Sequence, residues 1–297
     1  MESRNLYQEV TDKVLNELKK GVIPWAKPWK GGVAVSHTTG GAYTFLNQML
    51  ISFSSTASVV GGEYLTFKQV KKEGGSVRKG EKSALIMFYC KDYQTKEKDE
   101  DGEEYILTHE YDRPVLKAYH VFEVSQCEGI ERRHTIKPAA EGGEVLPVSD
   151  RAEAAAHAYL DGAGIPLVQR TSDTAAYNPT LDRIDMPCRE QFDSVARYYS
   201  TLFHEMTHST GAEKRLKRDL SGRFGSKKYA REELVAEMGA AYLSAILGTA
   251  DDESLKATAS YIENWSKALT EDNALVVYAA SRAQRAAEYI MSYSESK

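Results

Sequence analysis

An apolar face at helical spacing recurs in three long stretches of the chain. Over residues 5–20 the apolar side chains fall three or four positions apart, and Gly21 gives this stretch a natural end. The same spacing runs over residues 190–206, which are followed by Gly211, and over residues 228–248. These patterns predict three amphipathic helices, one near the start of the chain and two in its second half.

The first half of the chain otherwise mixes short apolar runs with glycine-containing turns. This predicts strands over residues 83–89 and 116–123 and a short helix over residues 66–73. The second half is mainly helical in pattern. Its other expected elements are a helix over 149–160 with Ser149 as its cap, strands over 167–171 and 183–186 around a turn at Asn178 and Pro179, and helices over 254–268 and 272–292.

Residues 128–148 separate these two halves. They lack any hydrophobic period and carry prolines and paired glycines, which is typical of a linker. We therefore predict an α+β protein with three parts. Residues 1–127 form an α+β domain, residues 128–148 a linker, and residues 149–297 a mostly helical domain with a small sheet.

Composition places the chain among globular proteins with an ample core, since 42% of its 297 residues are hydrophobic and 27% are charged. No apolar run approaches the ~20 residues of a membrane helix, and the first residues have no secretory pattern. The three cysteines are scattered, as reduced thiols of a cytosolic protein would be. We expect a cytoplasmic protein that does not bind membranes.

The net charge of −5 hides an uneven distribution along the chain. Residues 1–90 hold 12 Lys and Arg against 7 Asp and Glu, whereas residues 91–112 hold 3 basic against 9 acidic side chains. The acidic stretch is interpreted as the solvated tip of a hairpin between the two strands of the first half. Mimicry of nucleic-acid charge is the alternative.

Residues 204–208 read His-Glu-Met-Thr-His, inside the second predicted helix. Two histidines four positions apart share a helical face, so both imidazoles can reach one divalent ion. Glu205 between them can take a proton from a water at that ion. This is the H-E-x-x-H pattern of zinc metallopeptidases, and we predict His204 and His208 as ligands and Glu205 as the catalytic base.

A third ligand is needed, and the metzincin route to it fails because position 214 is Lys instead of His. On the next predicted helix Glu233 and Glu237 share a face, whereas Glu232 falls on another. The pattern Glu-x-x-Ala-Glu resembles that of gluzincin-type peptidases. The resemblance implies Glu233 as the third ligand and Glu237 as the partner that orients a histidine, with Glu237 as the alternative ligand.

Basic and aromatic side chains are interleaved in the first half. Binding of single-stranded nucleic acid requires both, because cations contact the phosphates and bases stack on aromatic rings. A solvated lysine-rich helix beside core aromatic residues is the simpler interpretation of the same pattern. The candidate DNA contacts are Trp25, Lys27, Trp29, Lys30, Tyr43, Lys68, Lys71, Lys72, Arg78, Lys79 and Lys82.

Several motifs resemble those of ArdC-type antirestriction proteins. They are Pro-Trp-x-x-Pro-Trp at 24–29, Thr-Phe-Lys-Gln at 66–69 and Val-Arg-Lys-Gly-Glu-Lys at 77–82, and in the second half residues 204–211 and Leu-Ser-Gly-Arg-Phe-Gly-Ser at 220–226. The resemblance covers essentially the whole chain. It implies a single-stranded-DNA-binding domain joined to a zincin-like metallopeptidase domain, carried by conjugative plasmids that enter a new host as single strands.

We therefore expect an antirestriction protein that binds single-stranded DNA and carries a Zn²⁺ site, with Mn²⁺ or Co²⁺ as other candidate ions. In a working peptidase, Tyr177 and Tyr229 are candidates for contact with the oxyanion, although packing is the favoured interpretation of both residues. The protein substrate would be a host restriction enzyme or another DNA-bound protein. Two alternatives remain open: a DNA-binding protein whose metal site is only structural, and a housekeeping peptidase whose basic half binds protein.

Overall fold

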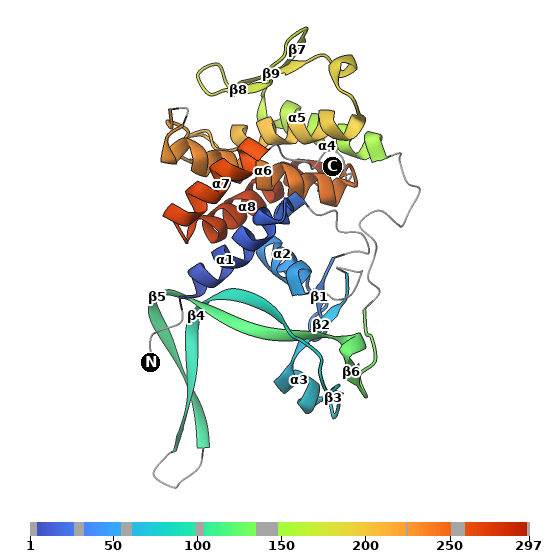
Figure 1. Cartoon of the computed structure of the whole chain (residues 1–297), viewed down its shortest axis with the longest axis vertical. Helices are drawn as coiled ribbons and strands as arrows, with labels where there is room; N and C mark the ends of the chain where they lie inside the picture. The colour runs from blue at the N-terminus through green and yellow to red at the C-terminus, as the bar shows by residue number, and fades with distance from the viewer. Residues whose placement is uncertain are drawn as a thin grey trace.

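The computed structural model describes residues 5–26, 33–54, 61–98, 104–134, 148–223, 225–250 and 259–295. Over these residues the molecule has a helical body, a long β-hairpin that projects from one end, and a small sheet that lies across the other end (Figure 1). Helices and small sheets both contribute, so the predicted α+β class is confirmed.

The first half contributes three helices to the described part of the chain. Helix α1 (Leu6–Lys19) begins at Asn5, whose side chain accepts a hydrogen bond from the backbone of Gln8. Helix α3 (Phe67–Lys72) is held at its start by a reciprocal pair of bonds between Thr66 and Gln69. Helix α2 (Phe45–Ser54) was not predicted. Its residues are buried on nearly every side, so the sequence shows no polar face and no helical period.

A four-stranded sheet runs in the order β1-β2-β5-β4. Its strands are β1 (Val35–Ser36), β2 (Glu63–Thr66), β4 (Ala84–Lys98) and β5 (Glu104–Glu123), and a separate pair joins β3 (Ser76–Val77) to β6 (Cys127–Glu128). Strands β4 and β5 form the projecting hairpin. The predicted hairpin between these strands is confirmed, but the strands extend through most of residues 91–112, which were predicted to form its tip.

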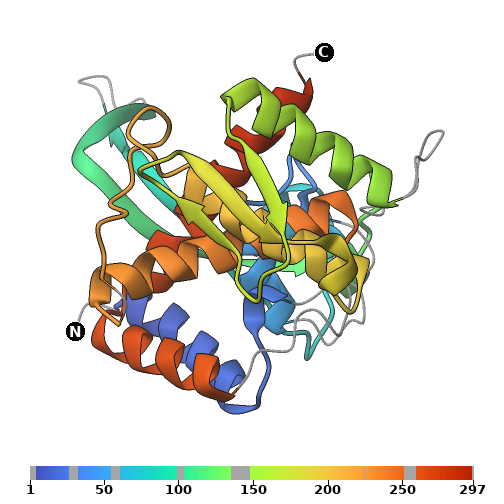
Figure 2. The same cartoon turned by 90° about the horizontal axis from the view of Figure 1, so that it is seen from above.

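The second half is mostly helical. Its elements are α4 (Val148–Ala163), β7 (Leu167–Arg170), β8 (Ala176–Asn178), β9 (Arg183–Pro187), α5 (Val195–Ser209), α6 (Lys227–Leu247), α7 (Ala259–Glu271) and α8 (Leu275–Glu295). The small sheet has the order β7-β9-β8, with β8 antiparallel to β9 at one edge, and it lies across α5 (Figure 2).

The predicted boundaries in this half need two corrections. Helix α5 begins later than expected because Ser194 caps it and a short turn precedes it. The predicted cap at Ser149 lies inside α4 instead of at its start. The expected start of the helix over 254–268 lies outside the described residues, and α7 is described from Ala259.

One hydrophobic core joins the two halves of the chain. Val14 of α1 and Phe45 of α2 belong to the same buried cluster as Leu234 of α6 and Leu269 of α7. At its edge Trp25 meets Trp265 of α7, with ring centroids 5.1 Å apart and planes at 71°. A second core lies between α4, α5, α6, α8 and the small sheet. No described helix is long and apolar enough to cross a membrane.

The segment predicted as a linker divides into two parts. Residues 135–147 lie outside the described residues. Before them, the backbone N–H groups of Arg133 and His134 both donate to the buried carboxylate of Glu63, at 2.6–3.0 Å, and this carboxylate also lies 2.5 Å from His37 Nδ1. The first residues of the predicted linker are therefore fixed to the first half.

Candidate functional site

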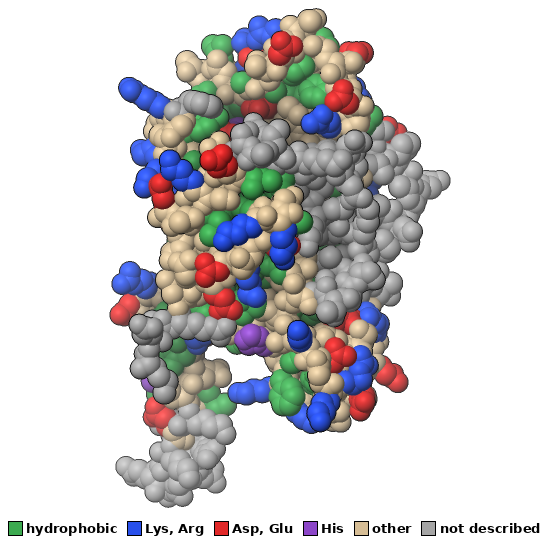
Figure 3. Space-filling model, in the orientation of Figure 1, with side chains coloured by type: hydrophobic (Ala, Val, Ile, Leu, Met, Phe, Trp, Pro, Cys, Tyr) green, Lys and Arg blue, Asp and Glu red, His purple; other side chains and the backbone are tan. Residues whose placement is uncertain are grey.

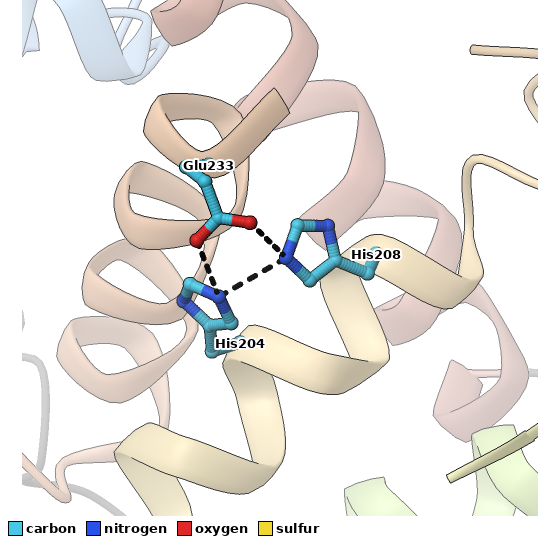
Figure 4. A group of neighbouring side chains, drawn as sticks. All are labelled: His204, His208 and Glu233. Atoms are coloured by element: carbon cyan, nitrogen blue, oxygen red, sulfur yellow. Dashed lines mark hydrogen bonds and ion pairs between the residues drawn. The ribbon is translucent and has the colours of Figure 1, made fainter. Parts of the chain in front are cut away.

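Helix α5 presents the His-Glu-Met-Thr-His motif toward α6. Because His204 and His208 are one turn apart, their rings lie side by side, and their Nε2 atoms are 3.1 Å apart. Glu233 of α6 faces both imidazoles (Figure 4). Its carboxylate oxygens lie 3.6 Å from His204 Nε2 and 3.3 Å from His208 Nε2.

These three side chains fit a divalent cation. They offer one ligand atom each, and the three atoms lie within 4.8 Å of one another. A tetrahedral ion with ligands at ~2.0–2.1 Å would hold neighbouring ligand atoms about 3.3 Å apart. The two Nε2 atoms, 3.1 Å apart, lie close to that value, and Glu233 places one oxygen 3.3 Å from His208 Nε2 and the other 3.6 Å from His204 Nε2. Three ligands from two helices also leave a fourth position open.

Close packing of α5 on α6 brings the ligands together. Gly239 of α6 lies against Thr207, the residue before His208. A Cβ added at Gly239 would come within 2.6 Å of the Thr207 side chain, so a larger residue would push the helices apart. Since Glu233 lies on the same helix as Gly239, this contact also sets the distance from Glu233 to the imidazoles.

Each histidine has a second carboxylate on its other ring nitrogen. Glu232 Oε1 lies 3.2 Å from His208 Nδ1, within hydrogen-bonding range, whereas Glu237 Oε1 is 3.7 Å from His204 Nδ1. Such partners fix the tautomer and the orientation of a ligating imidazole. The expectation that Glu232 points away from the site is therefore wrong. Its backbone lies on a different helical face, but its side chain reaches His208.

Arg218 holds Glu232 in place. Its guanidinium is 3% exposed and donates to both Glu232 oxygens, at 2.8 and 3.0 Å, and also to Thr207 O and Thr210 Oγ1 at the end of α5. The sequence analysis missed this residue. An isolated arginine in a loop between two helices gives no pattern that links it to a histidine ten residues away.

The electrostatics of the cluster favour positive charge. Burial alone would lower the pKa of both imidazoles, but the nearby carboxylates outweigh it. They raise the pKa of His204, and Glu232 and Glu233 raise the pKa of His208 to about 10. In turn, the imidazoles lower the pKa of Glu233 although burial opposes this. A divalent cation would replace the positive charge of the imidazolium groups between these acids.

Glu205 is buried, with 7% of its surface exposed, and contacts the small sheet. Its Oε2 accepts a hydrogen bond of 2.6 Å from the backbone N–H of Tyr177 in the edge strand β8. The Tyr177 hydroxyl instead donates to Asp182 and accepts from Arg215. The Tyr177 hydroxyl is engaged in that network, and its contact with an oxyanion stays a prediction. Tyr229, the other candidate, is half-buried in the first turn of α6.

The predicted DNA contacts are dispersed. Trp25 is 3% exposed and packed against Trp265, so a base cannot stack on it, and its selection as a DNA contact is wrong. Tyr43 is half-buried, and this burial raises the pKa of its hydroxyl to about 12. The basic residues are exposed on α3 and on the segment that follows β3, namely Lys68, Lys71, Lys72, Arg78, Lys79 and Lys82. Lys27, Trp29 and Lys30 lie outside the described residues.

Two family models match the chain. One, described as the N-terminal domain of the anti-restriction factor ArdC, matches residues 4–122. The other, described as a zincin-like metallopeptidase, matches residues 154–282. Among solved structures, the antirestriction protein ArdC of plasmid R388 in its metal-free form is 34% identical, with a TM-score of 0.69 and 98% of both chains covered. Its Mn(II)-bound form is 33% identical, with a TM-score of 0.70, and 97% of this chain and 98% of that one are covered.

Curated relatives are similar over nearly the whole chain. An uncharacterized protein, y4eC, of Sinorhizobium fredii is 30% identical over 96% of this chain and 91% of its own length. Two DNA primases named TraC, both of Escherichia coli, are 30% and 31% identical over 97% and 99% of this chain. The chain spans only 27% and 20% of the length of these primases.

Proposed function

Because the chain belongs to the ArdC-type antirestriction family, we propose that it protects incoming DNA from restriction by binding it as a single strand and that it carries a divalent-metal peptidase site. The metal site is supported above all by one observation, the convergence of three ligand atoms from α5 and α6 within 4.8 Å. DNA binding is supported by the exposed cations of the first half. The proposed domains are residues 1–127 and 149–297, joined by residues 128–148.

His204, His208 and Glu233 would hold the ion, with Zn²⁺ as the proposed metal. The existence of a Mn(II)-bound form of the R388 protein supports a divalent cation in this chain. When bound, the ion supplies a Lewis acid that polarises a peptide carbonyl and lowers the pKa of water. Glu232 and Glu237 orient the two imidazoles through their Nδ1 atoms, so that both Nε2 atoms stay directed at the ion.

Glu205 is the proposed general base. Its carboxylate lies on the same face of α5 as the two imidazoles and is fixed by the Tyr177 N–H bond to Oε2. It accepts a proton from the attacking water and then donates it to the leaving amine nitrogen. The edge strand β8 lies beside it, so a substrate peptide can pair with this strand in extended form. The substrate we propose is a DNA-associated host protein.

Substitution Glu205→Gln tests whether peptidase chemistry serves protection. The change keeps the volume and the Tyr177 bond but removes the base. We expect Zn²⁺ affinity and DNA binding to remain, while protection of conjugatively transferred DNA in a restricting recipient is lost. Glu213→Gln, the same change at an exposed position outside the site, is the control. Full protection by Glu205→Gln would reject the peptidase role and leave protection to DNA binding alone.

The two binding activities are testable on the purified protein. Zn²⁺ and Mn²⁺ affinities, measured by competition with a chromophoric chelator, should fall sharply in His204→Ala, since one of three ligands is removed. A gel-shift titration with a labelled thymidine oligonucleotide at two salt concentrations should show salt-dependent binding. Unchanged metal affinity in His204→Ala would reject the metal site. Absence of salt-dependent binding to the oligonucleotide would reject the single-strand proposal.

A further inference from the structure

A row of exposed and half-buried side chains, aromatic except for one lysine, follows the β4–β5 hairpin from the sheet toward its tip. We call it the aromatic strip. It consists of Phe88, Tyr93, His109, Tyr111, Lys117 and Tyr119. None of these residues was a predicted DNA contact, because they become neighbours only through the pairing of two strands.

The contacts along the strip are continuous. Phe88 pairs with Lys117 in the strand register, and its ring centroid lies 6.1 Å from that of Tyr119. Lys117 Nζ then lies 5.2 Å from the Tyr111 ring centroid. Further along the arm Tyr93 contacts Tyr111, with ring centroids 4.8 Å apart. The rings and the ammonium group thus form one connected surface.

This surface remains open to solvent. Phe88 is 39% exposed, and Tyr93 and Tyr119 are each 37% exposed. Cross-strand aromatic pairs stabilise a hairpin, which accounts for their pairing. It does not account for rings that remain exposed beside a cation, and large exposed apolar surface on a protein commonly marks a binding site.

Two acidic side chains of the arm, Asp92 and Glu110, are separated from the strip. Asp92 pairs with Glu110, next to the pair Tyr93 and His109. Because consecutive pairs in a hairpin point to opposite faces, these two carboxylates lie on the face away from the Tyr93 ring. Charge along the strip comes mainly from Lys117, and Glu97 approaches His109 only toward the tip.

We propose that the aromatic strip is a stacking platform for the bases of single-stranded DNA. The proposal rests on the DNA-binding part of the proposed function. Bases have apolar faces that stack on Phe and Tyr without regard to sequence, and an ammonium group between the rings pairs with the phosphates. The occupant is therefore a flexible strand with unpaired bases. A duplex hides these faces, so it does not fit the strip.

A second group of exposed cations and rings lies on a neighbouring lobe. Figure 3 shows an open notch between the hairpin arm and the lobe formed by α3 and β3, with basic and hydrophobic side chains side by side on that lobe. There Phe67 is 51% exposed and Lys71 Nζ lies 5.7 Å from its ring centroid. In the proposal, a strand bound along the strip continues to the cations of this lobe.

The test separates stacking from charge. The full-length protein is titrated with a 20-residue thymidine oligonucleotide and with an abasic oligonucleotide of equal length. Wild-type protein should prefer the thymidine strand by at least about tenfold, the effect of one base–ring stack. The double substitution Phe88→Ala with Tyr119→Ala should lower this preference strongly but keep the salt dependence. The pair Phe88→Tyr with Tyr119→Phe should restore it.

Tyr278→Ala is the matched control, since this ring is also 37% exposed and has two arginine side chains within 5.4 Å but lies on α8. It should bind like the wild type. If the wild type binds DNA and the double alanine variant of Phe88 and Tyr119 keeps the preference for thymidine, the stacking platform is overturned. The proposal of DNA binding then still stands. Absence of wild-type binding would overturn both. A change in oligomeric state on gel filtration, with DNA affinity unchanged, would assign the strip to contact between copies.

Discussion

The metal cluster and the aromatic strip use neighbouring side chains in opposite ways. The cluster gathers its ligands in a mostly buried space between two packed helices, with a further carboxylate fixing each imidazole. The strip spreads its rings along an exposed two-stranded arm. The first arrangement is preformed for one small ion. The second arrangement gives a long DNA strand many weak contacts, and each contact tolerates small shifts of the DNA.

This difference predicts where single substitutions have large effects. In the cluster every group is held by another, from Arg218 to Glu232 to His208, so one change propagates to the ligand. In the strip each ring contributes separately. The two regions nevertheless share the core between α1, α2 and α6–α8, so their stabilities are linked even though their chemistries are not.

The largest effect should come from disrupting that shared core at Trp265. This ring is buried and packs on Trp25 of the first half. Trp265→Ala should lower the free energy of unfolding by about 3–5 kcal/mol, because it leaves a large cavity. Chemical denaturation followed by circular dichroism, together with proteolysis of each half, measures this. Both halves should lose protection together, and Tyr278→Ala, which changes an exposed ring, should lower stability little. Loss of protection from proteolysis in the second half alone would mean that the two halves fold separately.

A smaller effect is expected in the network that holds the edge strand beside Glu205. Asp182 lies in the left-handed region with φ 45°, and it pairs with Arg215, whose side chain is 2% exposed. Asp182→Asn tolerates this backbone conformation but removes the charge. It should lower the free energy of unfolding at pH 7 by about 2 kcal/mol, the size of a hydrogen bond to a charged group. Denaturant titration measures this, with exposed Asp193→Asn as the control.

The same pair predicts a pH dependence. The hydrogen bond from Arg215 holds the pKa of Asp182 well below its usual range, although partial burial opposes this. A carboxyl whose pKa is lower in the folded state stabilises the protein above its unfolded pKa, about 4, and this contribution is lost as the pH falls further. The stability difference between wild type and Asp182→Asn should therefore be constant near neutrality and shrink below pH 4. A difference that does not depend on pH would reject the ionic role of Asp182.

At the metal cluster the two orienting carboxylates should differ. Glu232 bonds His208 at 3.2 Å and is fixed by Arg218, whereas Glu237 stands 3.7 Å from His204. Glu232→Gln should weaken Zn²⁺ binding by about tenfold, in the range known for such partners, and Glu237→Gln by less. Competition with a chelator gives both values. Equal losses, or a larger loss at Glu237, would show that the tight contact does not decide ligand orientation.

The sequence predicted the parts of the site that lie within one helix. His204, Glu205 and His208 follow from a four-residue spacing that fixes their mutual positions as soon as a helix forms. Glu233 required a resemblance, since its distance from the histidines depends on how two helices pack around Gly239 and Thr207. Glu232 was missed because its side chain bends toward His208 from another helical face. Arg218 was missed because the path of its loop brings it there, and residue spacing shows neither effect.

In the first half the predictions followed composition and were less complete. The α+β class and α1 were correct, but α2 was missed because it is buried on nearly all sides, and Trp25 was assigned to DNA although it belongs to the core. The strip could not be found from spacing, since Phe88 and Lys117 lie far apart in the chain and meet only through strand register. An exposed binding surface of this kind depends on which residues of two strands pair with each other. The hydrophobic and polar pattern within each strand does not specify that pairing.

The smallest effect concerns the cations of α3 and tests the distinction between stacking and charge. Lys71 and Lys72 are exposed in the last turn of α3, and Lys71 also covers the Phe67 ring. Replacing both by Gln should weaken binding of all single strands by a similar, modest factor. It should lower the slope of log affinity against log salt by about 0.7 for each phosphate that is no longer neutralised. Fluorescence anisotropy at four salt concentrations measures this slope. The preference for thymidine over abasic strands should stay intact, because no strip residue is changed. If that preference fell as well, charge and stacking would have to act through one shared surface, and the separation between lobe and arm would fail.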